Sequence, residues 1–116
     1  SYKQCMNVKN KECVIRVARY GPVVEILNND EKSTYIGLKP YMKMKKISDI
    51  KDIQKSDVEF LMKFPINYKE YTINYKSYGF YVQKNDKTLS VYPKFFDMLK
   101  NGKYEFIDIM FDKNKK

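Results

Sequence analysis

A pattern with a period of two marks two stretches of the chain: Cys13, Ile15 and Val17 alternate with Val14, Arg16 and Ala18, and apolar and polar residues alternate along 71–75. Side chains of a β-strand point to opposite faces of a sheet in turn, so this pattern predicts two strands that are each buried on one face. The apolar positions are Cys13, Ile15 and Val17 in the first stretch, and Tyr71, Ile73 and Tyr75 in the second.

Each of these strands is followed by elements in the same order. A bend, a returning strand, a polar hairpin loop and a further strand are expected after both. The ranges are 20–22, 23–27, 28–32 and 34–38 after the first strand, and 78–82, 84–87 and 88–92 after the second, where the bend and the returning strand together occupy 78–82.

Helix signals follow each set of strands. Ser56 and Glu59 have the spacing of a capping box, in which Ser56 caps the helix and Glu59 reaches back, and Pro65 ends the helix. The basic segment 43–46 is interpreted as a solvated loop rather than a phosphate clamp. The other expected segments are a leader at 1–10, a helical turn at 48–53, a linker at 67–68, a helix at 93–100 ending at Gly102, a helix (or, alternatively, a strand) at 103–111, and a polar tail at 112–116.

An internal repeat organises these elements. Tyr20-Gly21-Pro22 returns as Tyr78-Gly79-Phe80, and the two Tyr-Gly pairs lie 58 residues apart. At this offset Lys11-Glu12 matches Lys69-Glu70, and with a shift of five residues Lys39-Pro40-Tyr41 matches Tyr92-Pro93-Lys94. We therefore predict an α+β fold made of two tandem antiparallel β-sheet units, residues 11–65 and 69–111, each with one or two short helices.

The glycine of each Tyr-Gly pair predicts a tight bend. Glycine accepts backbone conformations that a residue with a Cβ resists, and proline at the next position is present in the first copy only. The bend is expected to direct Arg19 and Tyr20 outward.

Composition suggests a polyanionic partner. The chain has 116 residues, 23 basic against 14 acidic, for a net charge of +9, and 16% of its residues are aromatic. A basic, Tyr-rich domain favours nucleic acid. The alternative is a solvated Lys-rich surface without such a role.

Other kinds of site find little support in the residues. The chain has no histidine, and Cys5 and Cys13 lack the C-x-x-C spacing, so we expect no zinc site and no cofactor. A disulfide between the two cysteines is possible but not required. No apolar run approaches the roughly 20 residues that span a membrane, so no membrane partner is expected. We interpret the start at Ser1 as that of an excised fragment.

Aromatic residues beside basic residues at each bend are typical of single-stranded nucleic-acid binding, in which bases stack on rings and cations track the phosphates. A ring in the core is the alternative for each tyrosine. We favour the core for Tyr71 and Tyr75 and leave both possibilities open for Tyr20 and Tyr78. The candidate DNA-binding residues are Arg16, Arg19, Tyr20, Lys39 and Tyr41 in the first copy, and Lys76, Tyr78, Phe80, Tyr81 and Lys94 in the second.

These residues carry a family resemblance. The segment 19–25, Arg-Tyr-Gly-Pro-Val-Val-Glu, followed by Tyr35-Ile36 and by the helix 56–62 with Pro65 behind it, resembles the C-terminal repeat of type IA DNA topoisomerases. The chain has Val23 where that repeat has a tyrosine after Gly-Pro, whereas the second copy keeps this tyrosine as Tyr81.

The resemblance implies a non-catalytic C-terminal domain that binds single-stranded DNA and assists strand capture or passage. Its partners would be single-stranded DNA and the catalytic core of the parent topoisomerase, in the cytoplasm at the nucleoid or in a viral or host DNA compartment. The alternative is a protein-interaction module that docks a protein such as RNA polymerase. A standalone enzyme is not expected, because no nucleophile–base pair and no P-loop is visible.

Overall fold

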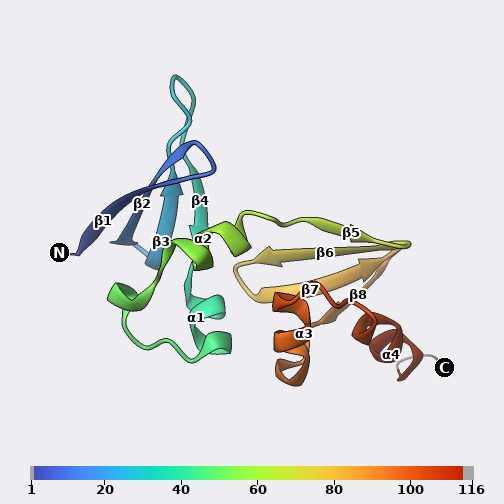
Figure 1. Ribbon diagram of the computed structural model, residues 1–116. Coiled ribbons are helices and arrows are strands. Elements are labelled where there is room, and N and C mark those ends of the chain that lie inside the picture. The colour runs from blue at the N-terminus through green and yellow to red at the C-terminus, as the bar shows by residue number, and fades with distance from the viewer. Residues whose placement is uncertain (1, 114–116) are drawn as a thin grey trace. The chain divides into compact units, whose positions relative to one another are not determined.

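The computed structural model describes residues 2–113, and the chain divides into two compact units between Lys63 and Phe64 (Figure 1). Unit 1 ends at Lys63, and unit 2 begins at Phe64. Each contains a four-stranded antiparallel sheet and short helices. The predicted α+β fold of two tandem antiparallel units is therefore confirmed.

Unit 1 begins with its sheet and ends with its helices. The strands follow one another in the sheet in chain order, so each is joined to its neighbour by a hairpin. The elements are β1 (Lys3–Val8), β2 (Lys11–Ala18), β3 (Gly21–Ile26), β4 (Thr34–Gly37), α1 (Lys39–Lys45), the 3₁₀ turn η1 (Ile50–Asp52) and α2 (Lys55–Leu61).

Unit 2 repeats this order. Its strands also follow one another in chain order. The elements are β5 (Ile66–Tyr68), β6 (Tyr71–Lys76), β7 (Gly79–Lys84), β8 (Lys87–Ser90), the 3₁₀ turn η2 (Pro93–Phe95), α3 (Phe96–Lys100) and α4 (Phe106–Lys113). The predicted helix at 93–100 and the helical choice for 103–111 are confirmed, with Gly102 at φ +72° after α3.

Strand register confirms the internal repeat. Ile15 pairs with Val24 and Val24 with Ile36, and the matching row in unit 2 runs from Ile73 to Val82 to Leu89. The exit from each sheet is also equivalent, because the N–H of Leu38 donates to Pro22 and that of Val91 donates to Phe80, at 2.9 and 3.0 Å. The bend, the returning strand and the proline-initiated helix thus occupy the same places in both units.

One face of each sheet is buried, and the other is largely open, except that Val14 on the second face of unit 1 is also buried. On the buried face of unit 1, Ile15 and Val24 are fully buried together with Leu38 and Tyr41 from the helical side. In unit 2 the sheet meets its helices through aromatic rings, since Tyr71 lies 4.9 Å from Phe111 between ring centroids. We call the opposite side of each sheet the open face. It carries Lys3, Arg16, Val23, Glu25, Tyr35 and Gly37 in unit 1, and Asn74, Lys76, Tyr81, Gln83, Thr88 and Ser90 in unit 2.

The first sheet starts earlier than the sequence indicated. Residues 3–8, predicted as part of a leader, form β1 and pair with β2 from Lys3–Arg16 to Val8–Lys11. The alternation is weak here because β1 is an edge strand in which only Val8 is buried. The predicted linker at 67–68 is likewise part of the edge strand β5.

These edge strands correct the register of the repeat near its start. Lys9 and Asn10 form the turn before β2, whereas Lys69 and Glu70 form the turn before β6. The sequence match therefore aligns Lys11-Glu12, which lie in a strand, with Lys69-Glu70, which lie in a turn, and the two pairs are not structurally equivalent. β2 is longer than β6 by two residues, which accounts for the difference.

The helices differ from the prediction in two places. The basic segment 43–46, expected as a loop, lies at the end of α1, where Lys43 and Lys45 complement the helix dipole. The capping box also lies two residues earlier than predicted, because Asp57, not Glu59, reaches back to the N–H of Gln54, at 2.8 Å. Ser56 lies inside α2.

The end of the chain is more helical than expected. α4 continues to Lys113, so the predicted polar tail 112–116 starts inside a helix, and residues 114–116 lie outside the described part of the chain. Within residues 2–113, no helix has the length and apolar character needed to cross a membrane.

Both bends place a glycine in a conformation that favours this residue. Gly21 has φ +122° and Gly79 has φ +108°, while the two residues before each glycine keep negative φ. The hairpins Ala18–Gly21 and Lys76–Gly79 close through these positions. The predicted tight bend at each Tyr-Gly pair is thus confirmed, and glycine is its structural requirement.

Gly79→Val is expected to destabilise unit 2 by about 1–3 kcal/mol, because a β-branched residue is strained at this positive φ. Amide hydrogen exchange of β6 and β7 in the full chain measures the loss. Gly37→Val is the matched control, since an added Cβ at Gly37 meets no atom within 4 Å and φ there is not positive. Full stability of the Gly79 variant would refute the role of glycine at the bend.

Candidate nucleic-acid interface

The tips of the two central hairpins present exposed tyrosines. Tyr20 is 88% exposed and Tyr78 is 66% exposed, although both are large hydrophobic residues in folded units. Each immediately precedes the glycine of its bend, so the hairpin geometry leaves no neighbouring strand to cover the ring. The structure therefore places both tyrosine rings on the surface and not in the core.

In unit 1 the exposed ring lies beside a guanidinium group. The Cζ atom of Arg19 is 5.4 Å from the ring centroid of Tyr20, within cation–π range. Arg19 is itself exposed. The tip therefore offers an aromatic face and a positive charge to the same solvent-facing surface.

In unit 2 the exposed ring lies beside a second tyrosine. The ring centroids of Tyr78 and Tyr81 are 5.3 Å apart with an interplanar angle of 36°. Tyr81 is on the open face, opposite Asn74, and is half-buried. Desolvation and then the neighbouring Tyr81 phenol raise the pKa of Tyr78 above its ordinary value. Lys76 is exposed at the same end of the hairpin, opposite Gly79.

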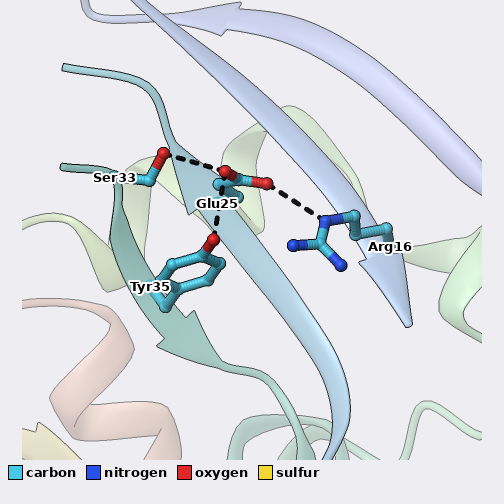
Figure 2. A network of polar contacts seen from close by, with 4 residues as sticks. All are labelled: Arg16, Glu25, Ser33 and Tyr35. Carbon is cyan, nitrogen blue, oxygen red and sulfur yellow. Dashed lines mark hydrogen bonds and ion pairs between the residues drawn. The ribbon is translucent and has the colours of Figure 1, made fainter. Parts of the chain in front are cut away.

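The open face of unit 1 carries a polar network around Glu25 (Figure 2). The carboxylate accepts hydrogen bonds from Arg16 Nε at 3.0 Å, Ser33 Oγ at 2.8 Å and the Tyr35 hydroxyl at 3.2 Å. Arg16 Cζ also lies 5.8 Å from the Tyr35 ring centroid. Glu25 thus joins β2, β3, β4 and the loop before β4 through side chains that all lie on one face.

Charges in this network stabilise one another. The hydrogen bond from Ser33, followed by that from Arg16, lowers the pKa of Glu25, and the hydrogen bond to Glu25 raises the pKa of Arg16. Both groups are charged across the physiological range. Since Glu25 holds the guanidinium through Nε, the orientation of Arg16 is fixed while its side chain remains 32% exposed.

Lys39 and Lys94 are exposed, as phosphate binding requires, but they lie on different kinds of element: Lys39 at the start of α1 and Lys94 in a 3₁₀ turn. Lys39 follows Leu38, whose N–H donates to Pro22 beside the bend, so Lys39 begins α1 near the tip end of β3. Lys94 lies in η2, with Nζ 5.3 Å from the ring centroid of Phe95.

Two residues of the predicted site are buried, so their rings are not accessible for base stacking. Tyr41 is 0% exposed, and its hydroxyl donates to the carboxylate of Asp57. Phe80 is 2% exposed and lies on the buried face of unit 2. Phe80 and Tyr81 are adjacent in β7, so their side chains point to opposite faces and only Tyr81 reaches the open one.

Sequence reasoning missed Lys3, Glu25 and Tyr35 as neighbours of Arg16. Glu25 and Tyr35 both lay in predicted strands, but it is the pairing register of β3 with β4 that places them opposite each other. Lys3 was assigned to the leader and gave no strand signal. Its position opposite Arg16 follows from the pairing of β1 with β2.

The described part of the chain offers no alternative site for a metal ion, since no three His, Cys, Asp or Glu side chains in residues 2–113 converge. Cys5 is exposed and Cys13 is buried, and both are free thiols. Burial raises the pKa of the Cys13 thiol.

Comparisons of the chain with protein-family models, with curated proteins and with solved structures found no match.

Proposed function

We propose that this chain binds single-stranded DNA through the tips of its two central hairpins. The observation that carries the proposal is the repeated placement of an exposed tyrosine beside a cation at a glycine bend, with Tyr20 next to Arg19 and Tyr78 near Lys76. Unpaired bases stack on such rings, and the cations contact the neighbouring phosphates.

The remainder of the chain supports this chemistry by charge. A net charge of +9 attracts a polyanion and raises its rate of encounter with the chain. Stacking accepts every base, because each base has a π-face, so the proposed binding has little sequence preference. Duplex DNA hides its bases within the helix and can engage the cations alone.

We further propose that the chain serves as a non-catalytic C-terminal part of a type IA topoisomerase. This rests on the resemblance of the two Tyr-Gly repeats to that family's C-terminal repeats. The hairpin tips would then hold a single strand for the catalytic core of the parent enzyme. Mixing the chain with a type IA catalytic core tests this role, and the expected result is faster relaxation of supercoiled DNA than with the core alone.

The test of binding compares fluorescent oligothymidine with a duplex of the same length at low and moderate salt. We expect preference for the single strand and a steep fall in affinity with salt. Absence of binding to either oligonucleotide at low salt would overturn the proposal. Salt-insensitive binding to an acidic protein, without DNA binding, would instead identify a protein-interaction module.

Tyr20→Ala and Tyr78→Ala are each expected to weaken oligothymidine binding by about tenfold, because base–aromatic stacking contributes about 1–3 kcal/mol per base. Tyr20→Phe and Tyr78→Phe are the matched controls, since they keep the ring, and should bind like the wild type. Both tyrosines are exposed, so circular dichroism should show unchanged folding. Unchanged affinity in both alanine variants would contradict stacking at these sites.

A further inference from the structure

Equivalent positions in the two units carry different chemistry near the hairpin tips. Unit 1 has two arginines at these positions, whereas unit 2 has neutral polar residues there and carries its tyrosine on β7, next to the tip, rather than on the outer strand. Strand register gives the equivalent pairs Arg16 and Asn74, Arg19 and Ser77, Val23 and Tyr81, Tyr35 and Thr88, and Gly37 and Ser90.

On the open face of unit 1, a row of four residues crosses the whole sheet. Lys3 pairs with Arg16, Arg16 with Val23, and Val23 with Gly37. Two cations lie directly opposite each other at one end of the row, an arrangement that is unfavourable unless an anion lies near. At the other end Gly37 leaves open space, with no atom within 4 Å of an added Cβ.

This row lies close to the tip of the same hairpin. Arg16 is two residues before the closing pair Ala18–Gly21, which corresponds to about 7 Å along a strand. The tip adds Arg19, which is exposed. Lys3, Arg16 and Arg19 therefore give three cations against the single carboxylate of Glu25, and Glu25 is engaged by Ser33 and Tyr35 as well as by Arg16.

The corresponding surface of unit 2 has fewer cations than that of unit 1 and two adjacent aromatic rings at its tip. Its equivalent row, Asn74, Tyr81 and Ser90, has no charge. The tip supplies two adjacent rings, Tyr78 and Tyr81, with centroids 5.3 Å apart. Lys76 is the cation of this tip within the described residues, and an extended aromatic surface takes the place of the guanidinium groups.

We propose that the two units divide the recognition of a single strand. Unit 1 makes most of the phosphate contacts, through Arg16, Arg19 and Lys3 beside the tip ring Tyr20, and unit 2 makes most of the base contacts, on the Tyr78–Tyr81 pair. This inference rests on the proposed single-strand binding and adds which chemical part of the strand each unit contacts. Guanidinium groups suit phosphate because they donate in a planar fork, and Glu25 accepts from Arg16 through Nε.

Two oligonucleotides of about twelve nucleotides separate these contributions. One is oligothymidine, and the other is an abasic strand with the same phosphates and no bases. For the wild-type chain we expect tighter binding of oligothymidine, with both affinities falling as salt rises. The change of log affinity with log salt reports phosphate contacts, and the ratio of the two affinities reports base contacts.

Arg16→Gln with Arg19→Gln should reduce the salt slope by about 1.4, since each phosphate contact of a single strand contributes about 0.7. The ratio between oligothymidine and the abasic strand should stay the same. The matched control is Asn74→Ala with Ser77→Ala, the equivalent positions of unit 2, and it should leave the slope unchanged. Arg19→Gln alone changes an exposed turn residue and should reduce the slope by about half as much.

Tyr78→Ala with Tyr81→Ala should lower the affinity ratio by more than the about tenfold expected for Tyr78→Ala alone, and should leave the salt slope unchanged. Val23→Ala, the equivalent of Tyr81 in unit 1, is the control and should leave the ratio unchanged. If the wild type binds single strands but the arginine variants keep the slope, or the tyrosine variants keep the ratio, the division of recognition is refuted and single-strand binding stands. If the wild type binds neither oligonucleotide, both proposals fail.

Discussion

Phe80→Ala is expected to destabilise unit 2 by about 3–5 kcal/mol, the usual cost of removing a buried phenylalanine side chain from a core. Phe80 is 2% exposed. Its ring centroid lies 4.6 Å from that of Tyr75, 5.1 Å from that of Phe64 and 6.0 Å from that of Phe96, so the ring joins β6 to α3. Alanine leaves a cavity at this junction, which the surrounding rings fill only in part.

Hydrogen exchange of the β6 and β7 amides in the full chain measures this loss. Phe80→Leu is the conservative control and should retain most of the stability, because it keeps much of the apolar volume. Tyr78→Ala is the surface control and should leave protection unchanged. If Phe80→Ala instead weakened oligothymidine binding and left the protection intact, Phe80 would be a stacking residue, against its burial.

Asp57→Ala is expected to destabilise unit 1 by about 2–3 kcal/mol, because the change removes a buried carboxylate that several groups share. Asp57 is 1% exposed. It accepts hydrogen bonds from the Tyr41 hydroxyl, Lys45 Nζ and the Gln54 N–H, so it joins α1 to the start of α2. The Lys45 side chain is 36% exposed, and water replaces part of its lost interaction.

The amides of β2 and β3, followed by hydrogen exchange in the full chain, measure the stability of unit 1. Glu59→Ala is the matched control, because Glu59 is the carboxylate that the sequence alone assigned to the capping box. We expect this control to change stability by less than about 0.5 kcal/mol. A larger loss for Glu59→Ala than for Asp57→Ala would contradict the cap formed by Asp57.

The same carboxylate gives unit 1 a pH dependence. Burial alone would raise the pKa of Asp57, but hydrogen bonds from Lys45, Tyr41 and Gln54 outweigh it, and the pKa is lowered in the folded chain. A lowered pKa contributes stability that is fully present above the unfolded value, about 3.9, and is lost as pH falls through the folded value. We expect Asp57→Asn to reduce this loss of stability below about pH 4 relative to the wild type.

The sequence alone determined the repeat, the two glycine bends and the α+β class. Gly21 and Gly79 could be recognised because few residues other than glycine tolerate the positive φ of the bend. A glycine repeated at this position is therefore enough to predict the bend. These features depend on local backbone geometry, and local geometry is what a short stretch of sequence encodes.

Which residues share a face of a sheet or a core became clear from strand pairing and packing. Tyr41 was predicted as a DNA-binding residue, but it is buried and its hydroxyl donates to Asp57, 16 residues further along the chain. Lys3 was predicted to lie in a leader segment, and its position opposite Arg16 follows from the pairing of β1 with β2. Edge strands and helix–helix contacts of this kind join residues that are distant in sequence, and their side chains show no local period because packing against the rest of the unit determines their burial.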